Sequence, residues 1–292
     1  MKQCCYVFWL FSHIGLAQVN QFGEMGIWEY SMVPGIGDVD LEKHNASLFG
    51  AFTLHKGLLE AGLTYNNHNF NFYGTSTDFD TTVYESMHTL TAHIAYRRPL
   101  NTQWSINVAM APMLSSNFNE VVSSEDFVMN AFLAFIRSWS HGNGASQLTM
   151  GIGYGTLFGS PRFFPIISFK NKVNERWSYS LGIPQTGISY AFTERHVLRA
   201  RVTPIGLYAN SSEPIFLNGI GYVQNPKLRF NGRDFGLEHN YRLQPRLTTV
   251  LRVGYTNVDN LDVLDDNNGI LYDFEPDGSP YITMGIQYNL ND

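Results

Sequence analysis

The chain has 292 residues, of which 44% are hydrophobic, 14% aromatic and only 15% charged. Soluble domains usually carry about 25% charged residues, so this composition argues against an ordinary soluble domain. The net charge is −6 and no basic run is longer than Arg97-Arg98, which gives no support for nucleic acid as a partner. The mean hydropathy of −0.15 is not that of a helical membrane protein. It is expected where apolar residues alternate along strands.

The first residues have the pattern of a secretory signal. Lys2 supplies the positive charge, an apolar stretch runs from about residue 5 to residue 16, and small residues precede Gln18 at the −3 and −1 positions. We therefore expect a signal peptide over residues 1–17, cleaved after Ala17, and a mature domain over residues 18–292. A membrane anchor is the alternative, but the apolar stretch is shorter than the roughly 20 residues that a spanning helix needs. Both cysteines, Cys4 and Cys5, lie in the signal, so we expect a mature domain without disulfides.

Alternating runs of apolar and small or polar residues then predict β-strands along the chain. An opening strand is predicted near residues 25–32 and a closing strand near residues 281–290. Between them, six tight connections flanked by alternating runs predict six hairpins, at residues 55–57, 98–102, 140–144, 171–175, 193–195 and 243–245. This gives about fourteen strands, with twelve as the alternative because the strands within residues 163–192 are short.

The remaining connections are mostly longer and more polar. They are predicted at residues 33–45, 67–82, 115–126, 210–232 and 258–279. Short turns at one end and long loops at the other are typical of outer-membrane barrels, whose short turns lie in the periplasm. After residue 17 no apolar run approaches the length of a transmembrane helix. The predicted fold is therefore all-β, an antiparallel up-and-down transmembrane β-barrel in the bacterial outer membrane.

The two faces of the predicted strands differ in a way that supports this fold. Trp177, Tyr179 and Leu181 form a bulky face, and the residues between them are Ser178 and Ser180. A soluble sandwich would hydrate its second face with many Lys and Glu residues, whereas a barrel places the bulky face against lipid and the small face in the lumen. A soluble secreted β-protein is the alternative class. It predicts neither the low charge nor the asymmetric loops.

Several aromatic residues fall close to the predicted periplasmic turns, at a common depth. We interpret them as a membrane-interface girdle, although aromatics also favour strands in general. They are Trp104, Trp139, Trp177, Tyr96 and Phe192.

Residues 165–202 resemble the core of an uncharacterised family of outer-membrane β-barrels from Bacteroidota-type Gram-negative bacteria, a domain of unknown function. The resemblance is carried by an Asn-rich turn, a strand with Trp177, the break Gly182-Ile183-Pro184, and the strand Ser189-Tyr190-Ala191-Phe192. It implies an outer-membrane barrel in contact with lipid and assigns no functional residue. Many such barrels end on an aromatic residue that the barrel assembly machinery reads. Tyr288 is the candidate here.

Strand parity also predicts charged residues in the lumen. Because Ala200 lies on the outward face of its strand, Arg199 and Arg201 face inward. The same reasoning places further groups in the lumen: Glu238, Arg252, Glu60 and His93. These residues fit either a charged constriction that selects solutes or a salt-bridged interior that rigidifies a closed barrel.

Catalytic and metal-binding patterns are weak. Ser178 or Ser189 with His196 would be the hydrolase candidates, but His196 flanks a turn and serine is common on a lumen face. The acidic stretch 259–269 lacks the spacing of a calcium loop, and the histidines are scattered. We therefore expect no enzyme activity, metal or cofactor. A passive channel or uptake porin for small solutes is the favoured function. A closed structural barrel and, with less support, a lipid hydrolase are the alternatives.

Overall fold

The computed structural model describes residues 25–73, 79–142 and 144–290. Their dominant feature is one large antiparallel sheet of fifteen strands. Its neighbours follow the chain order from β1 to β11, continue through β14, β15 and β17, and return to β1. Fourteen strands thus close into a barrel. The short strand β16 pairs with the last residues of β15, beyond the part of β15 that pairs with β17. The predicted signal peptide, with Cys4, Cys5 and the cleavage site after Ala17, lies outside the described residues.

The structure confirms fourteen barrel strands rather than twelve. They are β1 (Met25–Ile36), β2 (Val39–Leu54), β3 (Gly57–Phe72), β4 (Ser86–Pro99), β5 (Trp104–Ser116), β6 (Phe127–His141), β7 (Gly144–Gly155), β8 (Arg162–Lys172), β9 (Trp177–Ile183), β10 (Thr186–Ala191), β11 (His196–Asn210), β14 (Lys227–Gln244), β15 (Leu247–Leu264) and β17 (Ser279–Asn289). The loops contain two 3₁₀ helices, η1 (Thr82–Tyr84) and η2 (Ser124–Asp126), the hairpin β12 (Ile215–Leu217) and β13 (Gly221–Val223), and β16 (Ile270–Asp273). Within the described residues no helix is long and apolar enough to cross a membrane.

Side-chain alternation places the bulky residues on the outside of the barrel. On β5, Val108 and Met110 are 46% and 49% exposed, whereas Ala109 and Ala111 between them are 7% and 1% exposed. This is the reverse of a soluble sandwich, in which the larger apolar side chains would be buried. The outer surface is therefore suited to lipid.

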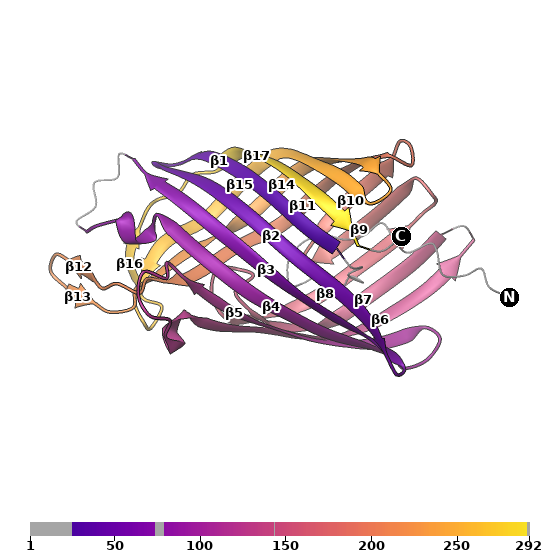
Figure 1. Cartoon of the computed structure of the whole chain (residues 1–292), viewed down its shortest axis with the longest axis horizontal. Helices are drawn as coiled ribbons and strands as arrows, with labels where there is room; N and C mark the ends of the chain where they lie inside the picture. Colours follow the sequence, from indigo (N-terminus) through magenta and orange to yellow (C-terminus); the bar gives the residue numbers. More distant parts are fainter. Residues whose placement is uncertain (1–24, 74–78, 143, 291–292) are drawn as a thin grey trace.

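The two ends of the barrel differ. Six hairpins turn at the end where β1 begins and β17 ends, which we call the turn end. The opposite end, which we call the loop end, carries the longer connections and the β12–β13 hairpin, which projects beyond the barrel (Figure 1).

Several predicted long loops are wrong in their bounds because the strands continue through them. Residues 33–45 form most of a hairpin in which β1 and β2 are joined by a turn at Gly37 and Asp38. The polar residues of this segment misled the sequence prediction because they alternate with buried residues such as Val39 and Leu41. In the same way β3 runs to Phe72, β14 begins at Lys227 and β15 runs to Leu264.

At the loop end the barrel narrows. The ends of β5 and β11 meet there in a parallel contact between Ser116 and Asn210, and the Asn117 amide donates to the Asn210 carbonyl at 3.3 Å. Nine strands, β1 to β5 with β11, β14, β15 and β17, thereby form a smaller ring, which we call the nine-strand ring. The strands β6 to β10 belong only to the wide part of the barrel.

An apolar cluster fills the nine-strand ring. Its members come from inward positions of the strands and from the loops, and the largest buried ones include Tyr84 at 0% and Phe230 at 2% exposure. Loop residues such as Phe79 and Phe274 pack edge-on in the same cluster, with ring centroids 6.4 Å apart. We call this group the loop-end cluster. It closes the lumen at this end because apolar side chains occupy the space between the strands.

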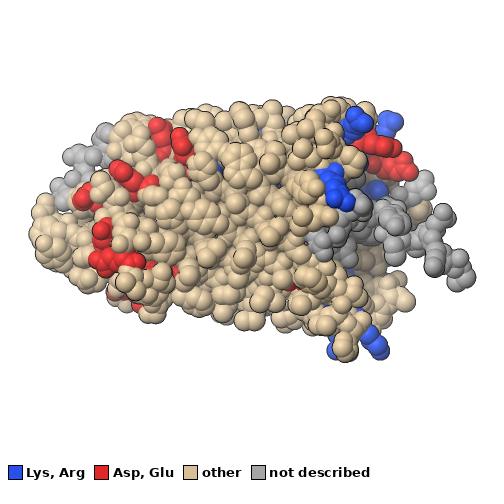
Figure 2. Space-filling model, viewed as in Figure 1, with Lys and Arg blue, Asp and Glu red and all other residues tan. Residues whose placement is uncertain are grey.

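Most of the charge on the visible outer surface lies near its two ends. Figure 2 shows acidic residues gathered at the loop end, basic residues gathered at the turn end together with a few acidic ones, and a wide uncharged band between them. Exposed acids at the loop end include Glu120, Glu125, Asp266, Glu275 and Asp277, and exposed bases at the turn end include Lys56, Arg98, Arg176 and Arg195. An uncharged band bounded by charges is the surface expected of a barrel that crosses a bilayer.

Candidate functional site

A cavity of about 350 Å³ occupies the lumen. On the side toward the loop end it is bounded by members of the loop-end cluster such as Val33 and Phe230, and toward the turn end by charged residues such as Arg201 and Arg252. Pockets for small molecules typically begin at about 300 Å³, so the space suits a small solute.

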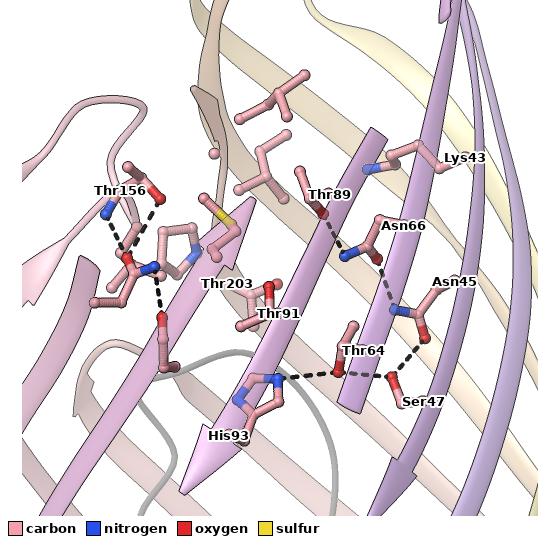
Figure 3. Close-up of a pocket in the computed structure, with 18 of the residues that line it drawn as sticks. Lys43, Asn45, Ser47, Thr64, Asn66, Thr89, Thr91, His93, Thr156 and Thr203 are labelled. Carbon is pink, nitrogen blue, oxygen red and sulfur yellow. Dashed lines mark hydrogen bonds between the residues drawn. The ribbon is translucent and has the colours of Figure 1, made fainter. Parts of the chain in front are cut away.

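One wall of the cavity is a continuous band of neutral polar side chains, which we call the polar wall. It lies on the inward positions of β2, β3 and β4, and Figure 3 shows its side chains pointing toward one another across the strands. Asn45 donates to Asn66 at 2.7 Å and Asn66 donates to Thr89 at 3.0 Å. The Ser47 and Thr64 hydroxyls are 3.0 Å apart, and His93 Nε2 lies 3.0 Å from the Thr64 hydroxyl. These side chains offer both donors and acceptors to the lumen.

The charged residues form a network between the polar wall and the turn end. The structure brings Arg199, Arg201 and Arg252 together around the buried carboxylate of Glu238, which is 1% exposed. The distances from the guanidinium nitrogens to the Glu238 oxygens are 3.2, 3.2 and 2.9 Å, in the same order. Asn240 also donates to this carboxylate, at 2.7 Å. The carboxylate of Glu238 on β14 therefore binds two arginines of β11 and one arginine of β15.

Glu29 on β1 completes this network, since Arg252 donates to it at 3.1 Å. Two other predicted residues, Glu60 and His93, also face the cavity but lie on β3 and β4. Glu60 interacts electrostatically with Arg97, and the His93 ring packs at 5.4 Å from the Phe49 ring. The six predicted lumen residues thus divide into a four-residue network and two residues on separate strands.

The charges that line the cavity itself balance. Lys43, Arg201 and Arg252 carry positive charge there, and Glu29, Glu60 and Asp234 carry negative charge. These six residues together carry no net charge. The arrangement differs in this respect from a pore lined by a ring of basic side chains.

The connection from β7 to β8 contributes a further part of the cavity. Asn130 on β6 accepts a hydrogen bond from the Thr156 amide at 3.0 Å, and Thr156 and Leu157 line the cavity. This connection passes close to Gly206 on β11, where an added Cβ would meet the Thr156 carbonyl oxygen at 2.6 Å. Glycine is required at residue 206 because two backbones approach each other there.

The predicted girdle residues lie on the outward face near the turn end, and several of their rings are in contact. Arg137 places its guanidinium 5.8 Å from the centre of the Trp104 ring and 5.5 Å from that of Trp139. The Trp177 and Tyr190 rings are 4.5 Å apart, and the Tyr190 and Phe192 rings 4.7 Å. Tyr96 covers Gly57 of the neighbouring strand, and Tyr288 is 43% exposed on β17.

Parity reasoning passed over several inward charges. Glu29 alternates with the outward residues Trp28 and Tyr30, so the same rule would have found it. Arg97 and Lys170 each lie one residue before a predicted turn, and their charges interact in the barrel. A pair at the loop end, Arg229 and Asp262, fell inside predicted loops.

The chain is matched over residues 59–289 by the profile of the domain of unknown function DUF6268. A comparison with curated proteins finds no match. Solved structures with a similar arrangement include an outer membrane channel from Pseudomonas putida F1, with TM-score 0.46 and 10% identity over 95% of this chain and 99% of that one. The outer membrane phospholipase A from Escherichia coli has TM-score 0.41 and 12% identity over 91% and 96%. The KdgM porin, solved with disordered oligogalacturonate, has TM-score 0.39 and 11% identity over 91% and 99%.

The profile covers most of the barrel, from β3 to β17, and includes the stretch on which the family resemblance was based. The chain therefore belongs to the DUF6268 family, a family of unknown function.

Proposed function

We propose that the protein is an outer-membrane channel for small, neutral, polar solutes, with the lumen cavity as the compartment that a solute occupies during passage. The single observation that supports this most is the polar wall, which supplies hydrogen-bonding groups in place of water. The balanced lining charges favour neutral solutes over ions. The outer-membrane location is supported by the closed barrel and its uncharged band, with short turns in the periplasm.

Passage through this barrel requires the loop-end cluster to move. The cluster is held by apolar packing between strand and loop residues, for example Phe72 against Phe274 at 4.9 Å. The loops can leave this packing without breaking the barrel's hydrogen-bonded wall. We therefore propose a channel that is closed at rest and admits solute when the loop side chains withdraw.

Swelling of proteoliposomes tests this function. Vesicles that contain the folded protein are transferred into isotonic solutions of glycerol, a pentose or a disaccharide, and swelling is expected for the smaller solutes and not for the disaccharide. In planar bilayers the ionic conductance is expected to be small, with a reversal potential near zero in a salt gradient. Heat-modifiable migration identifies folded protein. The proposal is wrong if neither the folded wild-type protein nor a folded variant with a weakened loop-end cluster gives swelling or conductance.

A further inference from the structure

A polar cluster interrupts the apolar outer surface of the barrel near the loop end. Ser86 and His88 on β4 face outward, because Met87 between them is buried in the loop-end cluster. On β3 the outward residues Asn67 and Asn69 are paired directly with His88 and Ser86 in the strand register. Tyr65 lies one outward position further along β3. This cluster lies on the opposite face of the wall from the cavity.

The side chains of this cluster are hydrogen bonded in the order of a nucleophile, a base and a group that orients the base. Ser86 Oγ lies 3.3 Å from His88 Nε2, and His88 Nδ1 lies 2.8 Å from the Tyr65 hydroxyl. The Asn67 amide donates to Ser86 Oγ at 3.0 Å and its nitrogen is 3.1 Å from His88 Nδ1. Ser86 Oγ also donates to Asn69 at 3.1 Å.

The imidazole ring is held in place by aromatic contacts. Its centre lies 5.9 Å from the Tyr65 ring and 6.0 Å from the Phe118 ring, and both pairs are within 17° of parallel. Phe118 comes from the connection between β5 and β6 and has a φ of 54°, a conformation that a bulky residue rarely adopts. Unusual backbone conformations of this kind are concentrated at functional sites.

We propose that Ser86 and His88 are the nucleophile and general base of an acyl-ester hydrolase that acts on membrane lipid. A serine hydroxyl within reach of an imidazole whose second nitrogen is oriented by another group is the arrangement that activates serine in hydrolases. Attack requires the tautomer in which His88 Nδ1 carries the proton and donates to the Tyr65 oxygen, with the Asn67 amide donating to Ser86 Oγ and not to Nδ1. It also requires the Ser86 hydroxyl to turn from Asn69 toward Nε2, which then accepts its proton. Tyr65 is thus a positioning residue, and the Asn67 amide is placed to donate to negative charge that develops beside Ser86 Oγ.

The surroundings identify the substrate class. On the side toward the turn end the cluster borders lipid-facing side chains, among them Leu63 at 56% and Leu90 at 44% exposure. On the side of β2 it borders the outward polar residues Glu42 and His44, so it lies at the edge of the apolar band. An ester reaching Ser86 from the apolar side belongs to a molecule whose acyl chains lie in the membrane. Both phospholipid and lipopolysaccharide carry such fatty acyl esters, and the loop end places the site in the outer leaflet.

The reaction balances with water as the only co-substrate. Ser86 Oγ attacks the ester carbonyl carbon while its proton passes to His88 Nε2. The carbon–oxygen bond to the alcohol breaks, and His88 returns the proton to the leaving alcohol. Water then attacks the acyl-serine and gives its proton to His88, after which that proton returns to Ser86 Oγ and the free fatty acid leaves.

Sequence alone pointed away from catalysis because the serines considered, Ser178 and Ser189, face the lumen. Residues 67–82 were expected to be a loop, so Asn67 was not placed opposite His88. The proposal does not depend on transport, because its residues lie on the outer face of the wall.

Covalent labelling provides the direct test. Folded protein in detergent micelles is treated with a fluorophosphonate, and the labelled residue is located by mass spectrometry. Ser86 is expected to be labelled, and Ser86→Ala and His88→Phe are expected to lose labelling by about 100-fold or more. Ser124→Ala is the matched control, since Ser124 is an exposed serine at the same end of the barrel. Heat-modifiable migration verifies that each variant is folded.

Product release distinguishes the two lipid sources. Mixed micelles of phospholipid in one arm and purified lipopolysaccharide in the other are assayed for free fatty acid. Tyr65→Phe is expected to lower kcat with little change in KM and to alter the pH profile, because it keeps the ring contact and removes the hydroxyl. Absence of both label and fatty acid release from folded wild-type protein would overturn the proposal, as would activity that persists in Ser86→Ala.

Discussion

Glu238 is the residue whose loss is expected to weaken the barrel most. Its carboxylate is 1% exposed and lies within 3.2 Å of nitrogens of Arg199, Arg201 and Arg252. With Glu29, these three arginines and two glutamates carry a net charge of +1, and Glu238→Gln raises it to +2. Removing one partner of a buried ion pair costs about 3–5 kcal/mol because the other charge stays buried without compensation. We expect a loss of stability in this range.

The matched control is an ion pair of similar length on the surface. Arg233 lies 2.8 Å from Asp259, and their side chains are 55% and 36% exposed. Asp259→Asn is expected to cost about 0–1 kcal/mol, since exposed pairs are screened by solvent. The free energy of unfolding is measured by urea titration in lipid vesicles, followed by tryptophan fluorescence and heat-modifiable migration. If Glu238→Gln costs under about 1 kcal/mol, or no more than the control, the reasoning about the buried network is wrong.

Three further changes test other parts of the structure. Phe274→Ala removes an aromatic ring from the loop-end cluster and is expected to increase proteoliposome swelling, so an unchanged rate would show that this ring does not restrict passage. Gly206→Ala places a Cβ 2.6 Å from a backbone oxygen and is expected to lower stability by about 1–3 kcal/mol in urea titration, whereas Gly26→Ala has nothing within 4 Å and should be neutral. Arg201→Ala leaves the cavity lining with an excess of negative charge, so the reversal potential in a salt gradient should shift toward cation preference, and a shift toward anions would contradict the assigned lining.

The number and direction of the strands could be predicted from the sequence because the tight turns carry distinctive residues. The six predicted turn positions lie where six hairpins turn at one end of the barrel. The lengths of the strands could not be predicted so well. Toward the loop end the outward positions become polar, as at Asp40 and Glu42, so the alternation there looks like a loop.

The same effect explains which functional candidates the sequence could indicate. Arg199 and Glu238 lie in strands with clear alternation, so parity was sufficient to place both in the lumen. The Ser86 and His88 cluster depends on the register between β3 and β4, which joins residues far apart in the sequence and within a predicted loop. The loop-end cluster likewise depends on the contact of β5 with β11. This contact joins Ser116 and Asn210, which are far apart in the sequence, so the residues next to either one do not predict it.

The nine-strand ring gives the barrel two circumferences, a wide one toward the turn end and a narrow one toward the loop end. Strands β6 to β10 enter only the wide circumference, and β9 and β10 are the shortest strands in the wall. A change in the length of a hairpin in this arc would therefore leave the strand pairings of the nine-strand ring in place. Different sets of strands thus set the width of the barrel wall and the packing that fills its loop end.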